Sequence, residues 1–151
     1  MHGAGPIVFC STLMLSLAAC MPPATSDTPN GSGSSTAGGK APALLEGPEW
    51  TVSTLDGEPV PQPAKVTIQF LEGERVAGNS GCNRFQGSYS GSRDSLSFGP
   101  LMGTRMACPQ PQMAVESRFF GLMQQVAGFE ITADGTLVLE TDDGKRILAE
   151  R

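Results

Sequence analysis

The chain has 151 residues, of which 39% are hydrophobic and 17% are charged. This length suits one domain with its own core and is short for two. Fifteen acidic and ten basic residues give a formal net charge of −5, and the basic residues are scattered singly apart from Lys145-Arg146. Nucleic acid is therefore not an expected partner, because phosphate binding requires a concentrated basic face.

Residues 1–19 have the pattern of an export signal. The apolar stretch from Pro6 to Ala19 has the length of a signal-peptide core and is shorter than the roughly 20 residues that span a bilayer as a helix. The first residues contain no Lys or Arg, although an export signal normally begins with positive charge, and a misassigned start codon would explain this departure. We expect a signal peptide over residues 1–19.

The signal ends in Leu17-Ala18-Ala19-Cys20, which resembles the lipobox of bacterial lipoproteins. In that motif small residues admit the peptidase, and the cysteine takes the lipid before it becomes the new N-terminus. Cys20 is therefore the expected lipid anchor, and several acyl chains on one cysteine hold a protein durably at a membrane. Met21 follows Cys20 where inner-membrane lipoproteins of enteric bacteria carry aspartate. The expected location is the outer membrane, with the protein facing the periplasm.

Residues 20–46 are rich in Pro, Gly, Ser, Thr and Ala. A segment of this composition buries too little apolar surface to offset its conformational entropy. It is predicted to be a flexible tether that leads from the anchor to a folded domain over residues 47–151.

Short alternations of apolar and polar residues recur in the predicted domain and indicate half-buried strands. They lie at 50–52, 66–70, 85–89, 96–98, 129–131 and 137–139. Asp134-Gly135 and Asp143-Gly144 separate the last runs, and Asp-Gly between alternating segments is a strong hairpin signal. The end of the chain is therefore predicted to form a three-stranded antiparallel meander.

Residues 112–127 break this alternation. Apolar residues recur there at spacings of four, three and four, at Val115, Phe119, Leu122 and Val126. This periodicity predicts one amphipathic helix that ends near Gly128 and packs its apolar stripe on the sheet. The predicted fold class is α+β and mostly β: a compact antiparallel sheet, or a partly closed small barrel, with one amphipathic helix packed on it.

Residue types that carry catalysis are scarce. The single histidine is His2, so the chain after the signal lacks the imidazole of Ser-His and Cys-His pairs. Carboxylates gather at two predicted hairpin tips, Glu72 with Glu74 and Asp142 with Asp143, where solvated acids are routine. We expect no enzyme, no metal site and no cofactor, and an unrecognised hydrolase is a remote alternative.

Two cysteines remain once Cys10 in the signal and Cys20 at the anchor are set aside. Cys82 and Cys108 are an even pair, and an oxidising envelope favours a disulfide between them. Two alternatives stay open. They are a redox couple, since Cys108 directly precedes the predicted helix, and two free thiols.

Two blocks of residues closely resemble the META/HslJ-like domain. They are Gly81-Cys82-Asn83-Arg84-Phe85, followed by Gly87 and Tyr89, and Gly99-Pro100-Leu101 followed by Thr104-Arg105-Met106-Ala107-Cys108-Pro109. The resemblance covers roughly residues 47–151. It implies an antiparallel sheet, partly closed like a barrel, with one helix against it. It also implies an exported or lipid-anchored envelope protein of a family linked to heat shock, to novobiocin resistance and, in some pathogens, to virulence and secretion.

The expected function is that of a non-enzymatic envelope lipoprotein that supports envelope integrity or stress and antibiotic tolerance by binding an envelope protein, peptide or lipid. A pilotin-like assembly factor for an outer-membrane secretion component is the alternative, because the implied fold resembles the pilotin lipoproteins. Asn83, Arg84 and Arg105 are the polar residues of the two blocks that would be examined for a ligand site. An arginine can equally donate hydrogen bonds to backbone carbonyls in a structural role.

Overall fold

The structure is a computed structural model and describes residues 43–151. The predicted signal peptide, the predicted lipid anchor Cys20 and all but the last four residues of the predicted tether lie outside the described residues. The elements in chain order are β1 (Trp50–Leu55), β2 (Glu58–Pro59), β3 (Lys65–Leu71), β4 (Arg75–Gly81), β5 (Arg84–Ser92), β6 (Ser95–Phe98), β7 (Met102–Gly103), α1 (Gln110–Met123), β8 (Val126–Ile131), β9 (Leu137–Thr141) and β10 (Arg146–Glu150).

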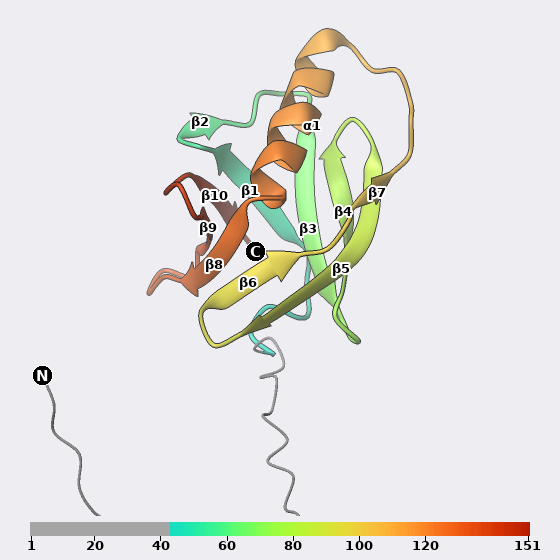
Figure 1. Cartoon of the computed structure of the whole chain (residues 1–151). Coiled ribbons are helices and arrows are strands. Elements are labelled where there is room, and N and C mark those ends of the chain that lie inside the picture. The colour runs from blue at the N-terminus through green and yellow to red at the C-terminus, as the bar shows by residue number, and fades with distance from the viewer. Residues whose placement is uncertain (1–42) are drawn as a thin grey trace, which may run out of the picture. The chain divides into compact units, whose positions relative to one another are not determined.

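Eight of these strands form a closed antiparallel barrel (Figure 1). Going round the barrel, the order is β1, β3, β4, β5, β6, β8, β9 and β10, and β10 pairs with β1 to close the ring. The short strand β2 extends the edge of β1, and β7 pairs with the beginning of β5. The mostly β, antiparallel prediction with one helix is confirmed, and the barrel is closed completely rather than in part.

Alternating residues of the strands fill the barrel. In β3, Val66, Ile68 and Phe70 are buried in the core, while Lys65 and Gln69 lie on the outer face. Trp50 is also buried, and its indole Nε1 donates to the Leu45 carbonyl oxygen at 3.2 Å. The alternation in the sequence therefore separates the interior from an outer face that is polar on this side of the barrel.

The predicted C-terminal meander is confirmed, since β8, β9 and β10 pair in succession. Both of its turns use a threonine and an aspartate two residues later. Thr132 bonds through its hydroxyl to Asp134, and Thr141 bonds in the same way to Asp143. Side chains that bond their own turn in this way stabilise tight hairpins.

The helix α1 ends earlier than predicted. It stops at Met123, and Val126, which we placed on the helical stripe, begins strand β8 and pairs with Thr141. The stripe up to Leu122 is correct, because Val115, Phe119 and Leu122 are buried. The prediction overran because Val126 is buried whether the chain there is helical or extended, so its spacing fits both patterns.

The packed structure begins slightly before the predicted boundary at residue 47. Leu45 is fully buried, and Glu46 pairs with Phe70 in an isolated parallel bridge. Arg151 holds this segment from the other end of the domain. Its Nη2 donates to the carbonyl oxygens of Leu45 and Glu46 at 2.8 and 2.9 Å, and its guanidinium lies 3.9 Å from the centre of the Trp50 ring.

Candidate functional site

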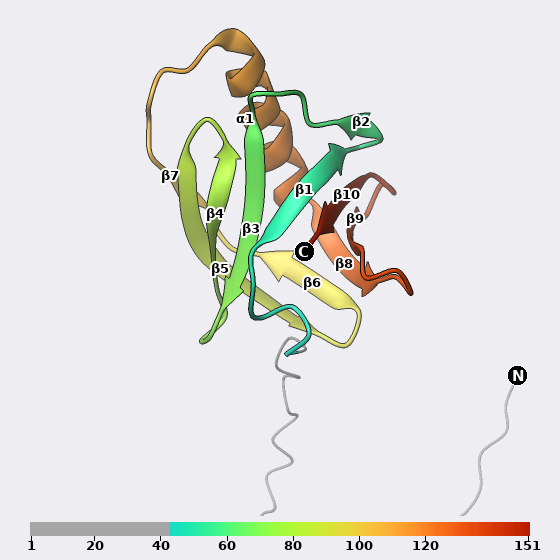
Figure 2. The same cartoon turned by 180° about the vertical axis from the view of Figure 1, so that it is seen from behind.

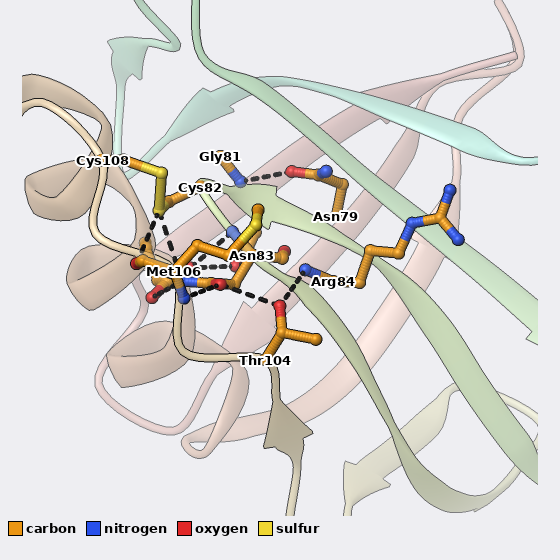
Figure 3. Close-up of a disulfide and its surroundings, with 10 residues drawn as sticks. Asn79, Gly81, Cys82, Asn83, Arg84, Thr104, Met106 and Cys108 are labelled. Carbon is orange, nitrogen blue, oxygen red and sulfur yellow. Dashed lines mark hydrogen bonds between the residues drawn. A yellow bond between two sulfur atoms is a disulfide. The ribbon is translucent and has the colours of Figure 1, made fainter.

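The turn between β4 and β5 is tied to the segment that enters α1. A disulfide joins Cys82, in this turn, to Cys108, with 5.9 Å between their Cα atoms (Figure 3). The predicted pairing of the two cysteines is thus present in the structure. Gly81, just before the turn, has a φ of 104°, a conformation that residues with a Cβ rarely adopt. The disulfide and this glycine place the turn against the helix.

Asn83 is the centre of a hydrogen-bond cluster beside the disulfide (Figure 3). Its Oδ1 accepts from the Thr104 hydroxyl and from the Met106 backbone N–H, each at 2.8 Å. Its Nδ2 donates to Glu116 Oε1 at 3.1 Å. Since only 3% of Asn83 is exposed, its amide is occupied within the protein and connects three segments: the turn, the loop after β7 and α1.

Glu116 supplies the helical side of this cluster. Its Oε2 accepts from the Asn83 backbone N–H at 2.9 Å and from the hydroxyl of Ser80, which is completely buried. The helical periodicity placed Glu116 outside the apolar stripe and gave no sign of this role. The signal in the sequence was the resemblance to the META/HslJ-like domain, which extends beyond the two blocks to Glu116 with Phe119 and Leu122.

On the opposite side of β4 from the barrel interior, outward-facing side chains line up across β3, β4 and β5, and one row continues onto β7. Strand register produces two rows, Thr67–Asn79–Arg84 and Gln69–Ala77–Gln86–Met102. Thr67 and Ala77 have short side chains and lie between longer ones. The result is a depression that we call the β4 trough.

The β4 trough has a volume of about 840 Å³. Figure 2 shows the face of β3, β4 and β5 that carries it, turned away from α1. Its lining residues are Glu49, Lys65, Thr67, Gln69, Ala77, Gly78, Asn79, Arg84, Phe85, Gln86, Met102, Gly103 and Thr104.

Two cations stand on opposite walls of the trough. Lys65 lies on the β3 wall, where its ammonium is 3.9 Å from the carboxylate of Glu49. This ion pair is exposed to solvent and therefore contributes little to the stability of the fold. Arg84 lies on the β5 wall, and within residues 43–151 its guanidinium forms no salt bridge and donates no hydrogen bond. The walls therefore carry two positive charges and one negative charge on a domain whose whole chain has a net charge of −5.

The three polar candidates from the sequence occupy different places. Arg84 lines the trough, Asn83 is buried in the cluster behind it, and Arg105 is exposed in the loop after β7 and is not part of the lining. Within residues 43–151 neither Arg84 nor Arg105 donates a side-chain hydrogen bond to a backbone carbonyl, so the structural clamp role weighed for them is not observed, and Arg151 makes such contacts instead. Sequence reasoning missed the amides Gln69 and Gln86, because only the pairing of β3, β4 and β5 brings them together.

Phe120 of α1 packs against the core rather than lining an open groove, with its ring 5.9 Å from that of Phe85 and 5.7 Å from that of Phe119. A substitution at Phe120 therefore tests packing rather than ligand binding.

The shifted pKa values belong to groups outside the trough. Hydrogen bonds from Lys145 and from Thr141 lower the pKa of Asp143 from 3.8 to about 2. Burial raises the pKa of the Tyr89 hydroxyl, and the carboxylate of Glu46 raises it further. Over residues 43–151 there is no helix of the length and apolarity that crossing a membrane requires. No trio of His, Cys, Asp or Glu side chains is placed to hold a metal ion in this part of the chain.

The fold and these features define a small disulfide-linked antiparallel β-barrel domain with one packed helix and a polar trough on its outer face. The chain belongs to the META domain family, whose model matches residues 43–151.

Two solved structures share the fold. A protein from Burkholderia xenovorans, determined by NMR, is 28% identical over 89% of this chain and 98% of its own, with a TM-score of 0.59. A second NMR structure is 25% identical over 73% of this chain and 93% of its own, also with a TM-score of 0.59. No curated protein matches the chain significantly.

Proposed function

We propose that this protein is a non-enzymatic lipoprotein of the bacterial cell envelope whose META domain binds an envelope component in the β4 trough. The observation that carries the proposal is the trough itself. Its volume of about 840 Å³ falls within the usual range of ligand sites, about 300–1,000 Å³. The trough is lined by polar side chains that have unused hydrogen-bond donors or acceptors, and the guanidinium of Arg84 is the main example.

The chemistry of the lining favours binding over catalysis. Amides, hydroxyls and cations can hold a ligand, and the lining contains no histidine, the commonest general acid or base. Glu49 is the carboxylate of the lining, and it is an exposed partner of Lys65. The hydrogen-bond donors and acceptors of this surface therefore support a binding function. We place that function in envelope integrity or stress tolerance.

Anchoring through Cys20 is the part of the proposal that the leader sequence supports. Cells that express the protein with radiolabelled palmitate are expected to label it and to retain it in the outer-membrane fraction. A Cys20→Ser variant is expected to be unlabelled. Palmitate labelling of the variant at the wild-type level would contradict a lipid anchor at this position.

Trough binding is tested by complementation of a strain that lacks the gene, challenged with heat and with novobiocin. Arg84→Glu reverses a charge on the trough wall and is expected to abolish complementation. Arg146→Glu is the matched control, because Arg146 is an exposed arginine on β10 that does not line the trough. Both variants should fold normally by circular dichroism. Full complementation by Arg84→Glu at normal expression would refute a function that depends on the trough.

A further inference from the structure

We infer that the ligand of the β4 trough is a stretch of acidic polypeptide that lies extended along β4. This inference rests on the proposed function and names the class of its ligand. It is argued from the width of the trough, from its charge and from the kind of polar groups on its walls.

The width suits a single extended chain. The floor follows β4, where Ala77 and Asn79 are the outward residues, and the walls rise from β3 on one side and β5 on the other. Since adjacent strands are about 4.8 Å apart, the two walls stand roughly 10 Å from each other. Strand β4 has 7 residues, and at about 3.3 Å per residue the trough accommodates a peptide of about that length.

The charge of the trough is opposite to that of the domain. Arg84 pairs in register with Asn79, and Lys65 pairs with Gly81, so the two cations flank the same end of β4. An extended chain between them would present carboxylates to both walls. A guanidinium without a protein partner is a strong binder of carboxylates, because its planar fork can donate two parallel hydrogen bonds.

The remaining wall groups suit a polypeptide backbone. Gln69 and Gln86 face each other across Ala77, and each side-chain amide offers a donor and an acceptor to the repeating amides of an extended chain. A lipid would instead need an apolar floor for its acyl chain. The floor has only the small Ala77 beside the polar Asn79, and the large exposed apolar side chain of the lining is Met102, which lies outside β4 on β7.

The cluster around Asn83 positions Arg84 for this role. Asn83 and Arg84 are adjacent residues whose side chains point in different directions, that of Asn83 into the cluster and that of Arg84 away from it (Figure 3). The Arg84 backbone N–H donates to the Thr104 hydroxyl at 3.2 Å, and that hydroxyl donates to Asn83 Oδ1. The disulfide of Cys82 is therefore next to the hydrogen-bond cluster that holds the backbone of Arg84.

The test uses the full chain, purified in detergent, and an array of synthetic peptides of about eight residues in which pairs of adjacent glutamates, or of adjacent glutamines, are separated by pairs of threonines, so that neighbouring carboxylates point to opposite walls. Binding is expected to rise with the number of glutamates, and the fully glutamate peptide should bind at least about tenfold more tightly than its glutamine counterpart. Arg84→Gln should lower affinity for the glutamate peptide by at least about tenfold, whereas Arg146→Gln should leave it unchanged. Raising the salt concentration should weaken the interaction.

Equal binding of the glutamate and glutamine peptides, or no binding of either, would overturn the acidic-peptide inference. So would Arg84-dependent binding to phosphatidylglycerol vesicles without binding to the peptides, which would assign the trough to a lipid headgroup. The complementation experiment makes no assumption about the ligand. If Arg84→Glu fails to complement and no peptide binds, the ligand class is wrong and the function of the trough stands.

Discussion

At the scale of single residues, Asn83 and Arg84 are neighbours in one motif but have different roles: Asn83 holds the fold together, and Arg84 is exposed on the surface. The amide of Asn83 is 3% exposed and bonds to the loop after β7 and to α1, whereas Arg84 is exposed on the trough wall. Their positions explain the division, because Asn83 lies in the β4–β5 turn beside α1, whereas Arg84 is the first residue of strand β5. The presence of both residues in one motif is therefore not by itself evidence that both meet a ligand.

Asn83→Ala is expected to lower the free energy of unfolding by about 3 kcal/mol. It leaves the Met106 N–H and the Glu116 carboxylate without their partner in a partly buried site, and each such loss costs about 1–3 kcal/mol. Asn79→Ala serves as the control, because Asn79 Oδ1 accepts one hydrogen bond, from the Gly81 N–H, and its loss should cost about 1 kcal/mol. Urea unfolding under non-reducing conditions measures both. Equal losses in the two variants would contradict a central role for Asn83.

At the scale of elements, β4 and its neighbours depend on a close approach of two backbones. The motif Gly78-Asn79-Ser80-Gly81 has few β-forming residues, and its glycines indicate a sharp corner with either positive φ or a close backbone approach. In the structure these residues end strand β4, and a Cβ at Gly78 would lie 2.0 Å from the Thr67 carbonyl oxygen of β3. Glycine is needed here because the neighbouring backbone occupies the space of a side chain.

Gly78→Ala is expected to destabilise the domain by at least about 2 kcal/mol, because the β3 backbone must shift to admit the methyl group. Gly121→Ala is the matched control on α1, where a Cβ would meet nothing within 4 Å. Since alanine favours the helical conformation, this variant should stabilise by about 0.5–1 kcal/mol. Thermal unfolding followed by circular dichroism compares them. A Gly78→Ala protein as stable as the wild type would show that β3 and β4 are not held at this spacing.

The elements also show what the sequence could predict. Alternation located the strands that bury bulky side chains, such as 66–70 in β3, and the Asp-Gly pairs located the final meander. The end of α1 was misplaced because Val126 suits a helix and a strand equally. The trough could not be predicted, since Gln69, Ala77 and Gln86 come together only through the register of three strands.

At the scale of the whole molecule, the disulfide connects parts of the chain that the barrel does not pair. It closes a sequence separation of 26 residues between the β4–β5 turn and the start of α1. In the chain-entropy account, a crosslink over a loop of this size stabilises the folded state by about 3–4 kcal/mol. The pairing could be predicted because only two cysteines follow Cys20, and its position next to the Asn83 cluster could not.

The double variant Cys82→Ser/Cys108→Ser is therefore expected to lose about 3–4 kcal/mol of stability in chemical denaturation. Wild-type protein in dithiothreitol should unfold at nearly the same denaturant concentration as the double variant. The variant itself should be insensitive to the reductant, which is the control for unrelated effects of thiols. Wild-type stability that is unchanged by complete reduction, verified by thiol titration, would show that the crosslink contributes nothing.

The pairing of β1 with β10 has a consequence for how the protein folds during its synthesis. The barrel joins its first strand to its last, and Arg151 fastens the segment at Leu45 and Glu46 from the far end of the domain. A growing chain that still lacks β10 has no partner for that edge of β1 and leaves one side of the core open to water. Contacts between such distant residues also form slowly. The domain therefore cannot complete its fold during synthesis until its final strand is available to pair with β1.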